Sequence, residues 1–394
     1  MTVSHITGVT RRSEKNVNMF MAETMEGYKH CKTGDLIINT MWAWMGALGT
    51  AREDGICSPA YGVYASRKFV PYSPGYFDYL YRTPKAVSEM TRNSKGIVSS
   101  RLRLYPKDFF QILTALPSYK EQTALAAYLD TKTSQIDRKI DLLSRKATQY
   151  GKLKQSLINE TVTRGLDRSA PMKESGVEWI GEVPTHWGLK RLKELAYIQN
   201  SNVDKKVHDE EIAVRLCNYV DVYRNDFIDG PLSLDFMWAT ADPSEINKFR
   251  IKKNDVLITK DSETADDIAI AALATETLDG VVCGYHLAQI RTNPKHLLGT
   301  YLFRLFQTNS YGHRFVTAAK GITRVGLGQA AIADALTPVP PLAEQRAISE
   351  YLDEKTAQMD RIIDTINSQI DKLKELRKAL INDVVTGKIK VDAG

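Results

Sequence analysis

The side chains that could do chemistry in this sequence do not form a catalytic motif. The seven histidines are scattered, and there is no His-Glu-x-x-His, no paired Cys/His spacing for zinc and no Gly-x-Ser-x-Gly turn. The closest approach to a phosphate-binding loop, residues 321–328, lacks the lysine that would reach a phosphate. Asp266-Asp267 is more typical of a solvated acidic turn than of a metal site. The sequence therefore predicts no catalytic residue and no metal ion in this chain.

The composition is that of a folded protein with two or three domains. Of 394 residues, 43% are hydrophobic and 25% charged, and the net charge of +6 would suit a polyanionic partner. The longest purely apolar run, residues 268–274, is far shorter than the roughly 18 residues of a membrane span, and residues 1–5 contain no apolar signal core. We therefore expect a cytoplasmic protein. The cysteines form no Cys-x-x-Cys pair, which favours buried, reduced thiols at Cys31, Cys57, Cys217 and Cys283.

An internal repeat organises the chain. Residues 116–137 recur 223 positions later as residues 339–360, and both copies contain a Pro-x-x-x-Glu-Gln segment followed by Tyr-Leu-Asp. The match continues without a gap to Thr163 in the first copy and Thr386 in the second. A duplicated unit fixes the architecture, so the elements on either side of each copy should correspond as well.

Each copy is predicted to be one long helix. Apolar residues alternate four and three positions apart, which is the a and d spacing of a coiled coil, and charged residues fill the other faces. Packing the two helices on each other would bury both narrow seams; the alternative is that each helix packs on its own domain. The predicted seam consists of Leu129, Thr133, Ile136, Ile140, Leu143, Ala147, Tyr150 and Leu157 in the first helix, and Leu352, Thr356, Met359, Ile363, Ile366, Ile370, Leu373, Leu380 and Val384 in the second.

Capping residues and composition give the boundaries. Ser118 with Glu121 fits a capping box, and Gly165 and Gly387 stand where a terminating glycine belongs. Pro171, Gly176, Gly181 and Pro184 mark a connector between the repeats. The predicted order is a domain over residues 1–117, a helix over 118–165, a connector over 166–185, a second domain over 186–338, and a second helix with its tail over 339–394.

The two domains also correspond, more weakly. Residues 28–38 and 249–258 both read as a polar turn that feeds a buried strand, and residues 216–220 as a further strand-like run. Lys95-Gly96-Ile97 recurs as Lys320-Gly321-Ile322, with a two-residue difference in spacing before the helix. Residues 301–306 read as an aromatic-rich helix. We expect mixed α/β domains within an α+β chain.

The chain resembles the specificity subunits of type I restriction-modification systems. The resemblance rests on Glu178-Trp179-Ile180-Gly181-Glu182-Val183-Pro184-Thr185-His186-Trp187, on Pro340-Pro341-Leu342-Ala343-Glu344-Gln345 and on Leu380-Ile381-Asn382-Asp383-Val384-Val385-Thr386-Gly387. It implies two target-recognition domains separated by an antiparallel coiled coil of the two long helices. Each domain would read one half of a split DNA sequence, and a change in helix length would change the accepted spacer.

The resemblance also implies partners and cofactors. A specificity subunit is not a catalyst: it docks two methyltransferase subunits through its conserved helical regions and, through them, the restriction subunits. S-adenosylmethionine, ATP and Mg would then bind only to those partner subunits, and this chain would hold no cofactor. One departure stands out, because about 40 residues precede the run at Leu216 whereas the similar run at Val3 begins almost at once. The first domain is therefore expected to lack its opening strands.

Candidate DNA contacts follow from side-chain type. Arg, Lys, Asn and Gln can reach base edges in the major groove while phosphate contacts fix the register. Residues 1–118 hold 15 basic and 9 acidic side chains, but residues 186–338 hold 18 and 19, so the second domain must gather its cations on one face. The candidates are Arg11, Arg12, Lys15, Arg92, Lys95, Arg101 and Arg103, interleaved with Trp42 and Trp44, in the first domain, and Lys205, Lys206, Asn218, Tyr219, Tyr223, Arg224, Lys260, Lys320, Thr323 and Arg324 in the second.

Two other hypotheses remain open at this point. The chain could be a duplicated coiled-coil scaffold with two protein-binding domains and no DNA contact. A nuclease or methyltransferase acting alone has less support because the catalytic motifs are missing. Within the DNA-binding hypothesis, the loop from Lys320 to Arg324 is the strongest single candidate, because a similar glycine-containing polar loop precedes the first helix.

Overall fold

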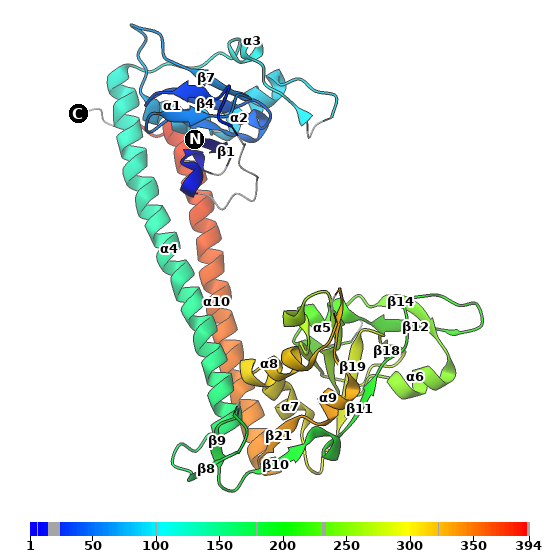
Figure 1. Ribbon diagram of the computed structural model, residues 1–394. Helices are drawn as coiled ribbons and strands as arrows, with labels where there is room; N and C mark the ends of the chain where they lie inside the picture. The colour runs from blue at the N-terminus through cyan, green and yellow to red at the C-terminus, as the bar shows by residue number, and fades with distance from the viewer. Residues whose placement is uncertain are drawn as a thin grey trace. The chain divides into compact units, whose positions relative to one another are not determined.

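The computed structural model describes residues 1–5, 7–14, 24–98, 101–178, 180–230, 234–321 and 323–391 (Figure 1). The chain divides into two compact units. Unit 1 comprises Met1–Arg145 with Thr365–Gly394, and unit 2 comprises Lys146–Asp364. The division passes through both long helices, so each unit contains one segment of each of them.

Unit 2 is built on a mixed five-stranded sheet. Its strand order is β11-β19-β15-β17-β13, and a smaller sheet has the order β14-β12-β18. The strands of unit 2 are β8 (Met172–Glu174), β9 (Glu182–Pro184), β10 (Gly188–Arg191), β11 (Ala196–Asn200), β12 (Ile212–Cys217), β13 (Phe227–Ile228), β14 (Met237–Ala241), β15 (Val256–Thr259), β16 (Asp261–Ser262), β17 (Ala271–Ala274), β18 (Val281–Cys283), β19 (Leu287–Thr292), β20 (Val325–Gly326) and β21 (Leu336–Val339). Its shorter helices are α5 (Tyr219–Arg224), α6 (Pro243–Phe249), α7 (Gly299–Phe306), α8 (Asn309–Ala318) and α9 (Gln329–Ala333).

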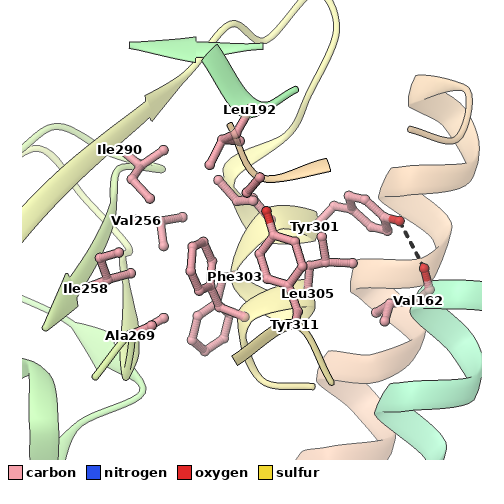
Figure 2. Close-up of a cluster of buried hydrophobic side chains, with 14 of the residues drawn as sticks. Val162, Leu192, Val256, Ile258, Ala269, Ile290, Tyr301, Phe303, Leu305 and Tyr311 are labelled. Carbon is pink, nitrogen blue, oxygen red and sulfur yellow. Dashed lines mark hydrogen bonds between the residues drawn. The ribbon is translucent and has the colours of Figure 1, made fainter. Parts of the chain in front are cut away.

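Helix α7 joins the large sheet of unit 2 to the long helices. It is mostly apolar, and every residue from Tyr301 to Phe306 is buried, including Arg304, which forms an ion pair with Asp353. A helix buried in this way is stable only when it is covered on every side. Figure 2 shows Phe303 beside the strand residue Val256, while Tyr301 points the other way, toward Val162. The buried Tyr301 hydroxyl donates a hydrogen bond of 3.0 Å to the Val162 carbonyl oxygen. This hydrogen bond satisfies the one polar atom of the ring and fixes α7 against the end of the first long helix.

Unit 1 contains a smaller version of the same arrangement. A three-stranded sheet has the order β5-β4-β7, and β3 pairs with β6. The strands of unit 1 are β1 (Thr2–Ser4), β2 (Gly8–Thr10), β3 (Lys29–Cys31), β4 (Leu36–Asn39), β5 (Leu48–Thr50), β6 (Gly55–Cys57) and β7 (Tyr61–Tyr64), and its shorter helices are α1 (Pro74–Leu80), α2 (Pro84–Asn93) and α3 (Pro106–Phe109). Sheet β5-β4-β7 corresponds to the central strands β17-β15-β19 of unit 2, because β4 and β15 follow the matching turns.

The long helices are α4 (Tyr119–Arg164) and α10 (Leu342–Val385). From Leu129 to Tyr150, every seam position is buried or half-buried and the residues between are exposed; on α10 the seam from Leu352 to Val384 is likewise the covered face. Near the end of α4, Ile158 is fully buried whereas its neighbour Leu157 is only half-buried. The apolar stripe therefore follows heptad spacing along most of each helix.

Within each unit the two helix segments pack antiparallel and share an ion pair. In unit 2, Lys154 Nζ lies 2.7 Å from Asp360 Oδ2, and Gly165 lies against Glu344. Residue numbers therefore rise along one helix as they fall along the other, which is the antiparallel arrangement. In unit 1, Arg377 Nε lies 2.9 Å from Asp137 Oδ1. Asp360 and Arg377 are the repeat equivalents of Asp137 and Lys154. The two ion pairs are therefore equivalent, except that α4 supplies the cation in unit 2 and α10 supplies it in unit 1.

A buried glutamine joins the start of each long helix to the loop before a short helix, which is α1 in unit 1 and α7 in unit 2. The Gln122 side chain donates to the carbonyl oxygens of Pro117 and Pro71 and accepts from the Ser73 amide. Its equivalent, Gln345, donates to the carbonyl oxygens of Pro340 and His296 and accepts from the Leu298 amide, all at 2.8 to 2.9 Å. Since buried backbone groups need partners, these glutamines fix the path of the chain into α1 and α7.

The capping predictions are confirmed by the structure, and one other local prediction needs correction. Ser118 and Glu121 bond reciprocally at the start of α4, and Gly165 and Gly387 have φ values of 76°. The strand predicted over residues 216–220 ends at Cys217, because Asn218 caps helix α5 with its side chain. Within the predicted connector, residues 166–185, strands β8 and β9 pair as an antiparallel hairpin.

Helices α4 and α10 are longer than a membrane span, but charged residues recur along both. Among the described residues, no helix contains a stretch that is long and apolar enough to cross a bilayer. In the same described part of the chain, His, Cys, Asp and Glu side chains form no group of three that could hold a metal ion.

All four cysteines are buried and unpaired. Burial raises the pKa of the Cys217 and Cys283 thiols. It also raises the pKa of the Cys31 and Cys57 thiols, which are buried less deeply. Little thiolate therefore forms at any of the four near pH 8. We expect Ellman's reagent to label fewer than one thiol per native chain at about pH 8 and all of them in denaturant, with little increase up to about pH 9. Exposed Ser169→Cys should add one fast-reacting thiol. Rapid labelling of the native parent would show that the thiols are accessible.

Candidate nucleic-acid interface

A hollow of about 480 Å³ in unit 2 brings together residues from five separate segments. It is open to solvent at the rim of the sheets. The contributing segments are the loop before β12, the start of α5, the β16 turn with the residues after it, the residue before β19 and the loop before β20. The residues that line the hollow are Lys205, Tyr219, Val220, Asp261, Ser262, Glu263, Thr264, Asp267, His286 and Arg324.

Arg324 is held at the rim of this hollow by a short strand pair. Strand β20 pairs antiparallel with β16, and Lys320 bridges to Gly326 across the intervening turn. The Arg324 guanidinium lies 2.9 Å from Asp261 Oδ1, which also lies 2.6 Å from His286 Nδ1. Asp261 therefore orients a cation whose side chain is still about half exposed. A guanidinium held in this way is pre-organised to donate to a phosphate or to a guanine edge.

Of two stacked tyrosines on α5, Tyr219 lines the hollow. The rings of Tyr219 and Tyr223 stack with centroids 5.5 Å apart and an angle of 15° between their planes. The Tyr219 hydroxyl lies 3.3 Å from Ser262 Oγ, and burial raises its pKa. A hydrogen bond to Asp267 raises the pKa of Tyr223. Both phenols therefore stay protonated and can donate hydrogen bonds or present a ring face to a base.

Lys260 does not line the hollow, and its side chain turns inward to other partners. Its ammonium donates to the Ser201 carbonyl oxygen at 3.2 Å and sits 4.6 Å from the ring centre of Tyr285. Desolvation by burial lowers the pKa of this lysine. A half-buried ammonium with these partners ties together the segments that carry Ser201 and Tyr285.

The hollow is electrically mixed. Lys205 and Arg324 provide cations, whereas Asp261, Glu263 and Asp267 provide carboxylates. Carboxylates can accept a hydrogen bond from the cytosine amino group, and cations can neutralise phosphates, so such a mixture suits selective contact better than uniform attraction. The sequence suggested that the second domain gathers its cations on one face; here, two of them stand among acidic side chains.

The remaining candidates of unit 2 lie at different places. Lys206, Arg224, Lys320 and Thr323 are exposed, with Lys320 and Thr323 on the same turn as Arg324. The Asn218 side chain accepts from the Val220 amide and so serves as the cap of α5. Its base-reading role stays a prediction, with only its amide nitrogen left to donate.

In unit 1 the candidates fall into separate groups. Lys95 and Arg103 pair across a turn that also carries Arg101, and Lys95 forms an ion pair of 2.9 Å with Asp108. Arg92 precedes this turn and pairs with Glu89. The bidentate partner of Arg11 is Glu53. Arg12 lies in the short 3-10 helix Arg12–Glu14, and Lys15 lies outside the described residues. Trp42 is about half exposed, and the Trp44 indole donates to the Met41 carbonyl.

Sequence reasoning missed the residues that orient the candidates. Asp261, Ser262 and His286 have no repeat partner or motif to mark them, and they meet Arg324 only through the β16–β20 pairing. The turn at Asp266-Asp267 was interpreted as merely solvated, yet Asp267 bonds Tyr223. The single available signal was the match between the turns at Lys95 and Lys320, which correctly located the loop.

Comparison with known proteins places this site in a family. Residues 184–372 match the family described as the type I restriction modification DNA specificity domain, and that stretch contains the whole hollow. The MjaVIII specificity subunit of Methanocaldococcus jannaschii is 21% identical over 291 residues, covering 72% of this chain and 64% of that protein. The MjaX specificity subunit of the same organism is 22% identical over 52% of this chain and 47% of its own length. The chain thus spans about half to two thirds of these two relatives.

A third relative and two solved structures extend the similarity over most of the chain. The StySPI specificity subunit of Salmonella potsdam is 21% identical over 83% of this chain and 68% of that protein. The HsdS subunit from Thermoanaerobacter tengcongensis has a TM-score of 0.54 at 17% identity, over 91% of this chain and 82% of that one. A chain from a structure of type I R-M complex assembly has a TM-score of 0.69 at 17% identity, over 91% and 83%. The family match over residues 184–372 and the three relatives make this chain similar to the type I restriction-modification specificity subunits, and its fold resembles that of the HsdS subunit.

Proposed function

We propose that this chain is the non-catalytic DNA-recognition subunit of a type I restriction-modification complex. The observation that carries the proposal is the convergence of Lys205, Tyr219 and Arg324 on one hollow within the stretch that matches the DNA specificity family. Arg324 lies more than 100 residues along the chain from Lys205 and Tyr219. Together the three side chains offer donors, a stacking ring and cations, which are the groups that read DNA.

The internal repeat supports a bipartite target. Each unit contains a β-sheet, a short helix with buried aromatic residues and segments of both long helices, and each carries a polar turn with a basic residue at its base. We propose that each unit reads one half of a split DNA sequence. Two methyltransferase subunits would dock on the conserved helices and bring the restriction subunits, so S-adenosylmethionine, ATP and Mg would belong to those partners and none to this chain. The complex would work in the cytoplasm, where its DNA is.

The Lys320 turn tests this function. Replacing Lys320 and Arg324 together by alanine should weaken binding to the specific DNA about tenfold or more and lower the salt dependence by about two phosphate contacts, because two cations are removed from the interface. The measurement is fluorescence anisotropy with a target duplex recovered by selection from random sequence, at several salt concentrations. The control is Lys146→Ala with Lys152→Ala, which removes the same charge from exposed positions on α4.

Three results would contradict the proposal. If the double variant and the control bound the selected duplex equally, the turn would not contact DNA. If selection recovered no sequence at all, the scaffold hypothesis would be favoured. Methyl transfer from S-adenosylmethionine by the isolated chain would contradict its non-catalytic assignment.

A further inference from the structure

Unit 1 carries a surface whose equivalent in unit 2 is covered by a segment of the chain. In unit 2, β10 pairs with β21 just before α10, and β11 pairs with β19 at the edge of the large sheet. Both covering strands come from residues 188–200. In the described ranges of unit 1, which omit residues 6, 15–23, 99 and 100, neither covering strand has a counterpart.

The first part of this surface is the edge strand β7. It is the equivalent of β19, because β4 pairs with Tyr64 as β15 pairs with Ile290. Strand β19 has β15 on one side and β11 on the other, whereas β7 is the last strand of its sheet among the described residues. An open edge of this kind presents unpaired backbone groups that can hydrogen-bond another strand.

The second part is the segment that leads into α4. Residues 113–116 read Leu-Thr-Ala-Leu, and their equivalents in β21 read Leu-Thr-Pro-Val. In unit 2 this segment is paired with Gly188–Arg191, and Thr337 is fully buried. In unit 1 Leu113 is 98% exposed, Phe110 68% and Leu116 47%. Three large apolar side chains exposed within seven residues indicate a contact surface more than a solvated loop.

The third part is a carboxylate at the start of each long helix. In unit 2, Glu344 Oε2 lies 3.1 Å from the Trp187 indole nitrogen and 2.8 Å from His186 Nε2, and both donors directly precede β10. The equivalent residue of unit 1, Glu121, is exposed and bonds only the helix cap at Ser118 among the interactions of the described residues. Unit 1 thus keeps the acceptor but not the donors that fill it in unit 2.

We propose that β7, Glu121 and residues 110–116, here called the open edge, bind an extended segment supplied by a partner polypeptide. The segment would consist of two short strands joined by a turn, with apolar side chains facing Leu113 and Leu116 and an indole or imidazole donor directed at Glu121. Its backbone would add a strand to β7, so main-chain hydrogen bonds supply affinity and side-chain pockets supply selectivity. The proposal concerns a protein contact and is independent of DNA binding.

The test uses the full chain and a fluorescent peptide with the sequence of residues 182–200, which fills the same role in unit 2. The peptide should bind saturably, and hydrogen exchange should slow at residues 61–64 and 113–116 when it is bound. Leu113→Glu should weaken binding about tenfold, because it places a charge against an apolar strand. The control Leu142→Glu alters an equally apolar, 60% exposed residue on α4 and should leave binding unchanged.

A double-mutant cycle tests the carboxylate contact. Glu121→Ala in the protein and alanine in place of the tryptophan of the peptide should each weaken binding, and together they should cost little more than either alone. Strictly additive losses would remove Glu121 from the site.

Several outcomes would overturn the proposal. These are absence of binding, exchange protection confined to residues 188–200 and 336–339, and binding that Leu113→Glu leaves intact. Light scattering provides one more: concentration-dependent dimers of the chain alone that Leu113→Glu abolishes would assign the surface to a second copy.

Discussion

Leu352→Ala is expected to lower the free energy of unfolding of unit 2 by about 2–5 kcal/mol, which is the range for removing a large aliphatic side chain from a closed core. Leu352 is fully buried on α10, in the same cluster as Ile158, Val162 and Tyr301. A cavity at this position would loosen α10, α4 and α7 together, since all three contribute to the cluster. Urea denaturation followed by circular dichroism measures the change.

Two variants make this prediction specific. Leu129, the repeat equivalent of Leu352, is also fully buried, and Leu129→Ala should destabilise unit 1 by a similar amount. Leu376→Ala removes the same atoms from a position on α10 that is 55% exposed and should change stability by less than about 0.5 kcal/mol. If Leu352→Ala and Leu376→Ala were equally mild, Leu352 would not lie in a closed core.

Gln345→Leu is expected to cost about 3 kcal/mol, although leucine is the more hydrophobic residue. The glutamine side chain bonds three backbone groups, on Pro340, His296 and Leu298, and leucine can bond none of them. A buried donor or acceptor that loses its partner costs about 1–3 kcal/mol, and the His296 carbonyl, on an exposed residue, can recover part of its loss from water. Thermal or urea unfolding gives the size of the effect.

The repeat again supplies the comparison. Gln122→Leu should destabilise unit 1 by a similar amount, because its side chain makes the equivalent three bonds. Gln135→Leu and Gln358→Leu change exposed positions on the same two helices and should be nearly neutral. A stabilising effect of Gln345→Leu would mean that the backbone groups find other partners and that burial of apolar surface dominates.

Local pattern was sufficient to predict the long helices and their ends. Heptad spacing predicted the covered face from Leu129 to Tyr150, and Ser118 with Glu121 predicted the cap, because both signals involve residues less than about two turns apart. The two-residue spacing difference before the second helix also has a structural counterpart. Thr83 and Thr308 cap the helices that follow α1 and α7, and these two caps are separated by the same number of residues as Lys95 and Lys320, which is two more than the separation of the long helices.

Sequence patterns were thus enough to predict the family resemblance, the duplicated α+β architecture and the turn at Lys320. Which polar residues meet became apparent only in the folded chain. Arg324 finds Asp261 and His286 through strand pairing across more than 35 residues, and Lys260 turns inward to Ser201. The tertiary structure also decided that the segment before α4 lies open while its twin before α10 is covered. The physical reason is range: helix periodicity is encoded between neighbours in the chain, whereas strand pairing and ion-pair geometry depend on distant segments that local pattern does not relate.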